Sequence, residues 1–141
     1  MKQIQGDVNL RNLYLKELPS ILTNVSVTGY FHCDDNKLTS LTGAPRSVGG
    51  YFDCSRNNLT SLANAPSSVG LDFYCSINDL TSLAGAPRSV TGRFDCVNNN
   101  LTSLAGAPSS VGGSFNCSDN DIKFTVEQVR AVCDVKGEIF V

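Results

Sequence analysis

The sequence has no tryptophan, one histidine, one methionine and no long apolar run. A membrane-spanning helix needs about 20 consecutive apolar residues, so none is expected. The formal net charge of −2 is too small to favour nucleic acid or an anionic membrane as a partner. The start, MKQIQGDVNLRNLYL, lacks the apolar core and cleavage site of a secretory signal. We therefore expect no nucleic-acid or membrane partner and a cytoplasmic location.

Sequence motifs typical of catalytic, nucleotide-binding or metal-binding sites are also missing. No phosphate-binding GxxxxGK[ST], dinucleotide-binding GxGxxG or nucleophile-elbow GxSxG occurs. The single histidine, His32, has no second histidine or paired carboxylates at the spacing of a zinc site. No pair of carboxylates stands out for acid–base catalysis. We expect a protein that is not an enzyme and that holds no metal or other cofactor.

What the sequence does contain is repetition with a constant step along the chain. Several unrelated residue types keep this step in phase, and a period of about 20–29 residues predicts a solenoid in which each repeat is one coil. The repeated positions include Phe31, Phe52, Phe73, Phe94 and Phe115; Cys33, Cys54, Cys75, Cys96 and Cys117; and Asn36, Asn57, Asn78, Asn99 and Asn120.

Each repeat has the consensus V-G-G-x-F-x-C-x-x-N-x-L-T-S-L-x-G-A-P-x-S. Its F-x-C-x-x-N-x-L segment resembles the leucine-rich-repeat core L-x-L-x-x-N-x-L. The L-T-S-L-x-x-A-P-x-x-V segment is similar to the short repeats of bacterial type III effectors, although Ala63, Ala84 and Ala105 replace a proline there. The full consensus, over about residues 25–124, most resembles leucine-rich-repeat proteins of bacteriophages and other large DNA viruses. Because that family is defined by its scaffold, the resemblance implies the fold more strongly than the function.

We expect one mostly β domain over residues 1–141, a right-handed leucine-rich-repeat solenoid with a parallel concave sheet and an extended convex side. Residues 1–26 are expected to form an N-terminal cap or degenerate repeat, 27–124 five repeats with the last one partial, and 125–141 a C-terminal cap. Thr125 and Gln128 have capping-box spacing, which predicts a short helix. We expect Val126, Val129, Ala131 and Val132 of that helix to cover the last coil, and GEIFV to form a terminal strand.

The repeated positions have structural interpretations. A strand places Phe52 and Cys54 on one inward face, and Leu59, Leu62 and Val69 complete the coil. Stacked asparagines are expected to bond backbone groups that the turn leaves unpaired. A column of Gly43, Asn64, Gly85 and Gly106 predicts left-handed backbone. The aligned cysteines predict small buried free thiols rather than metal ligands or disulfides. The recurring Thr-Ser pair predicts a turn held by side-chain to backbone bonds.

The outward positions of the strands differ between repeats, and partner contacts are expected where copies differ. We expect a protein partner with a basic or polar protruding surface, because carboxylates outnumber cations there and Tyr and Arg are typical contact residues. By its viral resemblance the chain would bind and modulate or inhibit a host protein through the concave face. Two alternatives stay open: drift after repeat duplication, and a self-assembling structural protein; the chain would be a monomer or a homodimer. The predicted partner-binding residues are Tyr30, His32, Asp34, Tyr51, Asp53, Arg56, Asp72, Tyr74, Arg93 and Asp95.

Overall fold

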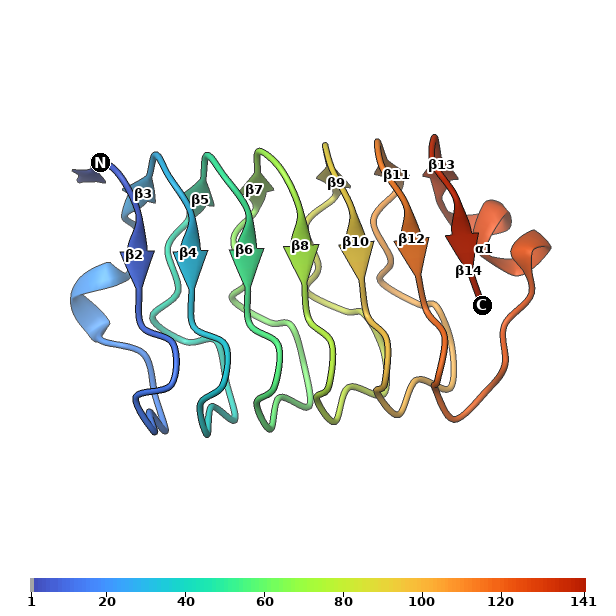
Figure 1. The fold of residues 1–141 in the computed structure, drawn as a ribbon, viewed down its shortest axis with the longest axis horizontal. Coiled ribbons are helices and arrows are strands. Elements are labelled where there is room, and N and C mark those ends of the chain that lie inside the picture. The colour runs from blue at the N-terminus through green and yellow to red at the C-terminus, as the bar shows by residue number, and fades with distance from the viewer. Residues whose placement is uncertain (1) are drawn as a thin grey trace.

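The computed structural model describes residues 2–141. Over these residues the chain winds into seven stacked coils, and each coil gives one short strand to each of two parallel sheets (Figure 1). The chain descends through the front strands and rises behind them as it advances from the N-terminal to the C-terminal end, which makes the coil right-handed. The expected mostly β solenoid with a short C-terminal helix is confirmed.

The front sheet has the strand order β14-β12-β10-β8-β6-β4-β2, and we call it the Phe sheet. It is the expected parallel sheet: Phe31, Phe52 and Phe73 pair in register with one another, and so do the later phenylalanines. Its strands are β2 (Val8–Asn9), β4 (Phe31–His32), β6 (Phe52–Asp53), β8 (Phe73–Tyr74), β10 (Phe94–Asp95), β12 (Phe115–Asn116) and β14 (Ile139–Phe140).

A second sheet, which we call the Val sheet, is not evident from the sequence. Its strand order is β1-β3-β5-β7-β9-β11-β13, and the strands between its two outer ones are the Ser-Val pairs that precede each turn into the Phe sheet. The valines point inward and are buried, whereas the serines stay nearer the surface, with Ser26 Oγ and Ser47 Oγ 2.7 Å apart. Its strands are β1 (Gln3–Ile4), β3 (Ser26–Val27), β5 (Ser47–Val48), β7 (Ser68–Val69), β9 (Ser89–Val90), β11 (Ser110–Val111) and β13 (Asp134–Val135).

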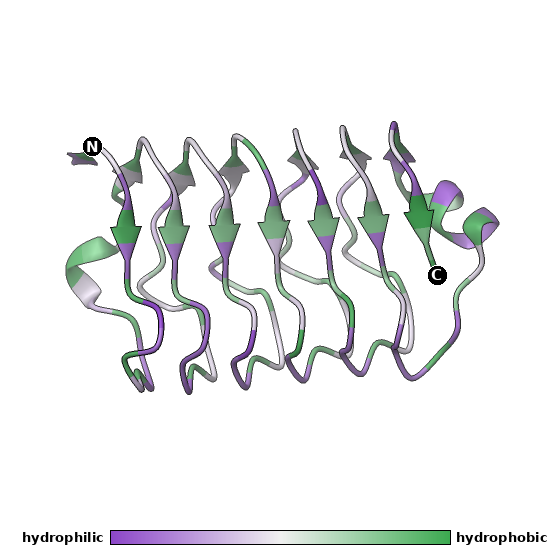
Figure 2. Cartoon of the chain, in the orientation of Figure 1, coloured by the Kyte–Doolittle hydropathy of each residue, from purple (hydrophilic) through white to green (hydrophobic). Residues whose placement is uncertain are grey.

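The core lies between the two sheets and the Leu-x-x-Leu segments. Phe52 and Phe73, with ring centroids 5.3 Å apart, belong to a continuous stack of five buried rings. The cysteines are buried free thiols, as expected. Figure 2 shows most front strands changing from apolar to polar along the arrow, whereas β14 stays apolar. Stacking therefore buries an apolar face that one coil could not bury alone.

The expected turn conformations are confirmed. Gly43, Asn64, Gly85 and Gly106 all have positive φ angles, from 68° to 95°. The serine of each Thr-Ser pair accepts a bond from the backbone N–H two residues later, for example Ala63 N to Ser61 Oγ at 3.0 Å. The structure adds a second left-handed column: Asp35, Arg56, Ile77, Asn98 and Asp119 have φ angles of 54° to 56°. This column is the turn by which the chain leaves each strand of the Phe sheet.

The two ends are built differently. At the N-terminal end, β1 and β2 pair with the next coil, and a short 3-10 turn, η1 (Ser20–Leu22), follows them. At the C-terminal end, helix α1 (Val126–Val132) begins with the predicted capping box and precedes β13 and β14. The expectation for its apolar face is partly wrong: Val129 is buried, but Ala131 and Val132 are exposed. Val129 and the residue that ends the helix, Cys133, are buried in the core, whereas Val132 is exposed.

Candidate functional site

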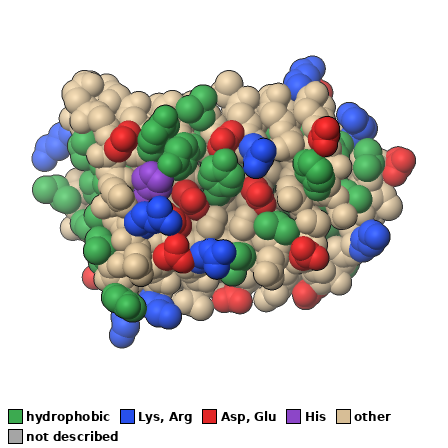
Figure 3. Space-filling model, in the orientation of Figure 1, with side chains coloured by type: hydrophobic (Ala, Val, Ile, Leu, Met, Phe, Trp, Pro, Cys, Tyr) green, Lys and Arg blue, Asp and Glu red, His purple; other side chains and the backbone are tan. Residues whose placement is uncertain are grey.

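The outward face of the Phe sheet carries the positions that differ between repeats. The sheet register places His32 beside Asp53, Asp53 beside Tyr74, and Tyr74 beside Asp95. All four residues are half-buried. In Figure 3, which shows this face, the purple side chain of the single histidine lies among hydrophobic, acidic and basic side chains.

Three tyrosines and His32 form a continuous aromatic cluster over β4, β6 and β8. The rings of Tyr30 and Tyr51 stack with centroids 4.3 Å apart and planes 19° apart. Tyr51 meets His32 edge-on at 5.0 Å and Tyr74 edge-on at 6.0 Å. Tyr51 is therefore the centre of the cluster. We call Tyr30, His32, Tyr51 and Tyr74 the tyrosine patch.

Hydrogen bonds fix the orientation of two of these rings. The Tyr51 hydroxyl lies 2.9 Å from His32 Nε2, and the Tyr74 hydroxyl donates to Asp72 Oδ2 at 2.8 Å. Burial and the bond to Asp72 raise the pKa of Tyr74 to about 12. Burial and the nearby Asp53 carboxylate raise the pKa of Tyr51. Both phenols therefore stay neutral and hold these positions at physiological pH.

Asp34 is the most deeply buried carboxylate beside the patch, with 7% of its side chain exposed. Its Oδ2 pairs with an Arg11 guanidinium nitrogen at 3.3 Å. Its Oδ1 has no hydrogen-bond partner among the described residues, and His32 Nδ1 lies 3.6 Å away. Burial first, and then the charge of Asp53, raise the pKa of Asp34 above its ordinary value. A buried carboxylate with an unbonded oxygen costs stability, which makes Asp34 unusual among the carboxylates of this face.

The other carboxylates of this face accept hydrogen bonds from neighbouring groups. Asp53 Oδ1 accepts from Ser55 N at 2.9 Å, and Asp72 Oδ1 accepts from Arg93 N at 2.6 Å. Asp95 Oδ1 accepts from the Ser76 hydroxyl at 2.8 Å. These bonds fix each carboxylate in place. The face therefore presents fixed rings beside fixed carboxylates.

The structure separates the predicted residues into three places. Tyr30, His32, Asp34, Tyr51, Asp53, Asp72 and Tyr74 come together in the N-terminal half of the Phe sheet. Arg93 and Asp95 lie further along, in a shallow hollow that Ser114, Asn116 and Phe140 complete. Arg56 lies outside the sheet in the second left-handed column, with its Nε 3.9 Å from Asp35 Oδ1.

Sequence reasoning missed Arg11 and Phe140, which come from the end coils. The register pairs Val8 with Phe31, and this step is longer than the step from Phe31 to Phe52, so the first coil is out of phase with the regular repeat. Aligning VNLR at 8–11 with FHCD at 31–34 would have placed Arg11 opposite Asp34. The sequence assigns Phe140 to a terminal strand but gives no sign that it joins the outward face.

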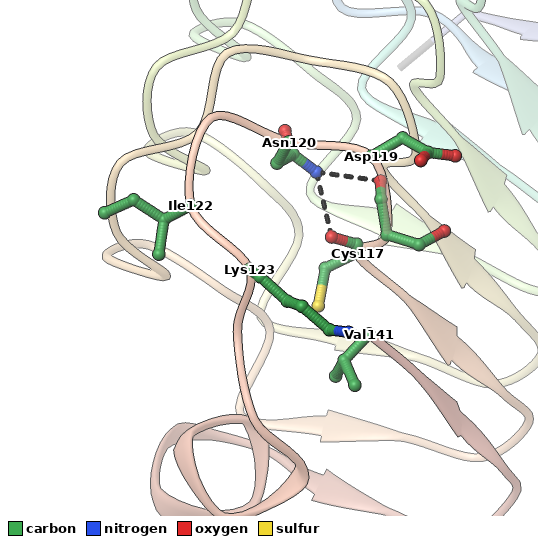
Figure 4. Close-up of a pocket in the computed structure, with 7 residues that line it drawn as sticks. Cys117, Asp119, Asn120, Ile122, Lys123 and Val141 are labelled. Carbon is green, nitrogen blue, oxygen red and sulfur yellow. Dashed lines mark hydrogen bonds between the residues drawn. The ribbon is translucent and has the colours of Figure 1, made fainter.

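Another hollow lies at the C-terminal end of the core, beside Val141 (Figure 4). There Asn120 Nδ2 donates to the carbonyls of Cys117 and Ser118 at 3.0 and 3.2 Å, as its counterparts do in earlier coils. Burial raises the pKa of Cys117 to about 11, so its thiol is protonated at neutral pH. The hollow therefore continues the structural pattern of the repeat.

Two further findings apply to residues 2–141. No group of three or more His, Cys, Asp or Glu side chains is arranged to hold a metal ion. None of the helices in this part of the chain is long and apolar enough to cross a membrane. Comparison of the chain with protein-family models, curated proteins and solved structures gives no match.

Proposed function

We propose that the protein is a non-enzymatic binding scaffold whose tyrosine patch contacts a protein partner. The observation that carries this proposal is the cluster of three tyrosines on one sheet face, with Tyr51 and Tyr74 held by hydrogen bonds. Tyrosine is enriched at the centres of protein interfaces. Rings that are already fixed lose little side-chain entropy on binding, so they favour affinity.

The charges around the patch define the partner that fits it. Asp34, Asp53, Asp72 and Asp95 lie on this face, against the guanidinium groups of Arg11 and Arg93. A partner with a basic or polar protruding surface complements this balance. The resemblance of the repeats to viral leucine-rich repeats extends the proposal to a host protein as that partner, which the scaffold would modulate or inhibit.

The proposal is tested by capture from extracts of candidate host cells, with three forms of the protein immobilised in parallel. One is the wild type, one carries Tyr51→Ala with Tyr74→Ala, and one carries Arg88→Ser. Arg88 is an exposed position that is serine in neighbouring repeats, so its variant is a matched control. A protein retained by the wild type and by R88S, but lost from the double variant, supports the proposal. Equal retention by all three forms contradicts it.

A second candidate function is self-association into a structural assembly. It is favoured by the free outer edges of β1 and β2 at one end and of β13 and β14 at the other. Exposed strand edges readily pair with another chain. Tyr14 and Ile21, which are 76% and 74% exposed, add apolar surface to the N-terminal coil. Sedimentation velocity over a wide concentration range tests this candidate, and a monomer throughout excludes it.

A further inference from the structure

Resting on the proposed function, we propose that the surface around Asp53 is the seat of one cationic side chain, a lysine or arginine of the partner protein. This inference names the chemistry that the tyrosine patch recognises. It depends on three observations: the position of Asp53 among the rings, the incomplete bonding of Asp34 behind it, and the arrangement of the nearby cations.

Asp53 lies between two members of the patch in the sheet register. His32 on β4 and Tyr74 on β8 are its neighbours in the sheet register, and Tyr51 lies two residues earlier on the same face. Its Oδ1 accepts from the backbone of Ser55, and no bond to its Oδ2 occurs within residues 2–141. Two attractions would act on a cation at this position. The carboxylate oxygen attracts it by charge, and the negative faces of the neighbouring aromatic rings attract it through cation–π interactions.

Asp34 supplies the independent observation. Its side chain is more than nine-tenths buried, and its Oδ1 has no hydrogen-bond partner in the described part of the chain. That oxygen lies 3.6 Å from Nδ1 of His32, a member of the tyrosine patch. The negative charge of Asp53 disfavours ionisation of Asp34 and so raises its pKa. A cation seated at Asp53 compensates both carboxylates, which the isolated protein leaves incompletely neutralised.

The protein's own cations do not fill this seat. Arg11 is engaged by two other carboxylates: it pairs with Asp34 Oδ2 at 3.3 Å and lies 3.8 Å from Asp35 Oδ2. Arg93 directly precedes β10, where its backbone bonds to Asp72 and its exposed side chain borders the hollow near Phe140. Neither guanidinium forms an ion pair with Asp53 among residues 2–141. The negative charge of Asp53 is therefore available to a cation of the partner.

The test is a titration with octalysine followed by ¹H–¹⁵N nuclear magnetic resonance, with octaglutamate as the probe of opposite charge. We expect octalysine to shift the backbone resonances of Tyr51, Asp53 and Tyr74 more than those of the C-terminal coils. Octaglutamate should leave these resonances in place. Asp53→Asn should weaken octalysine binding at least fivefold, while the amide oxygen of the asparagine can still accept from Ser55 N.

The matched control is Asp121→Asn, which removes the same charge from an exposed residue at the C-terminal end. It should change octalysine affinity less than twofold. Equal weakening by D53N and D121N, or shifts spread evenly over the protein, would overturn the inference. If a protein is still captured through Tyr51 and Tyr74 in that case, the proposed function stands without this cation site. If octalysine binds at Asp53 but no protein depends on the tyrosines, the proposed function fails and the cation site remains.

Discussion

The side-chain oxygen of Asn57 accepts a hydrogen bond from the backbone N–H of Leu38, in the preceding coil, at 2.9 Å. Asn57 Nδ2 also donates to the carbonyls of Cys33 and Cys54, both at 3.0 Å. One amide therefore joins two coils through backbone groups that the turn leaves unpaired. Asn78 and Asn99 make the same connections further along the solenoid.

Replacing Asn57 with alanine should lower the free energy of unfolding by about 2–4 kcal/mol, because it leaves several buried backbone groups unsatisfied. Leu38, whose N–H loses its acceptor, is fully buried. Urea unfolding followed by circular dichroism measures the change. The control is Asn58→Ala at the exposed neighbouring position, which should cost little. An equal effect of the two substitutions would show that the bridging bonds do not stabilise the stack.

Much of the fold follows from spacing in the sequence. Phe52 and Cys54, two residues apart, define one inward face, and the constant step between repeats sets the register from coil to coil. The Val sheet was not predicted because each regular coil gives it a single inward residue, a valine, without the pair of inward residues two apart that indicates a strand. The register of the first and last coils could not be predicted, because the steps from Val8 to Phe31 and from Val111 to Val135 are longer than the regular step between repeats.

The candidate site was predictable only in outline. Strand alternation shows which side chains point outward, so Tyr51 and Tyr74 could be assigned to one face. It does not show that Tyr30 stacks on Tyr51, or that one oxygen of Asp34 is buried without a partner. Those features depend on how side chains from different coils pack, including Arg11 from a coil outside the regular repeat. Whether these residues bind a partner stays a prediction.

Ile77 is a branched side chain held at a φ of 54°, where its counterparts Asp35, Asn98 and Asp119 are residues that tolerate this conformation. Its side chain is partly exposed, so packing only partly compensates the strain. We expect Ile77→Asn to raise the free energy of unfolding by about 1 kcal/mol, because left-handed backbone costs about 1–2 kcal/mol for an ordinary residue. Thermal and urea unfolding measure the gain. Ile77→Val keeps the branched carbon and should give no gain; a loss of stability in I77N would contradict the strain.

The six buried thiols should resist reaction in the folded protein. Burial raises the pKa of Cys54 and Cys75 well above the ordinary value, and that of Cys133 to about 11. Little thiolate, the reactive form, then exists near neutral pH. We expect an aromatic disulfide reagent to modify the native protein slowly and to titrate all six cysteines after denaturation. Rapid modification of one thiol in the native protein would show that its burial is incomplete.

The same thiols predict a loss of stability in alkali. A pKa raised by folding means that the native state holds these protons more tightly than the unfolded chain does. The unfolded thiols ionise from about the ordinary value of 9.0, and Cys117 and Cys133 ionise in the native state at about 11. The free energy of unfolding should therefore fall as pH rises from about 9 to 11. Urea unfolding at a series of pH values measures this slope, and a flat profile across that window would contradict it.

Asp34 should destabilise the protein when it is ionised. Burial and the charge of Asp53 raise its pKa above the ordinary value of 3.8, so the native state prefers the protonated form. The stability from this group is present below the ordinary pKa and is lost as pH rises through the raised one. Asparagine resembles the protonated acid and can donate a hydrogen bond. Asp34→Asn should therefore unfold with a free energy about 1 kcal/mol higher than the wild type at neutral pH.

Asp34→Asn also removes the negative charge that pairs with Arg11, which should lower the free energy of unfolding. The size of this loss decides whether the substitution stabilises or destabilises the protein. The Arg11 side chain is 54% exposed and lies 3.3 Å from Asp34 Oδ2, so water screens the attraction. Such pairs contribute about 0–1 kcal/mol, which is less than the cost of an unsatisfied buried carboxylate. Urea unfolding of D34N and wild type at neutral and acidic pH separates the two terms, because the difference should vanish once Asp34 is protonated. Asp35→Asn, which removes a more exposed carboxylate near the same arginine, is the control and should show no such gain. A D34N protein less stable than the wild type at neutral pH would mean that the Arg11 pair dominates.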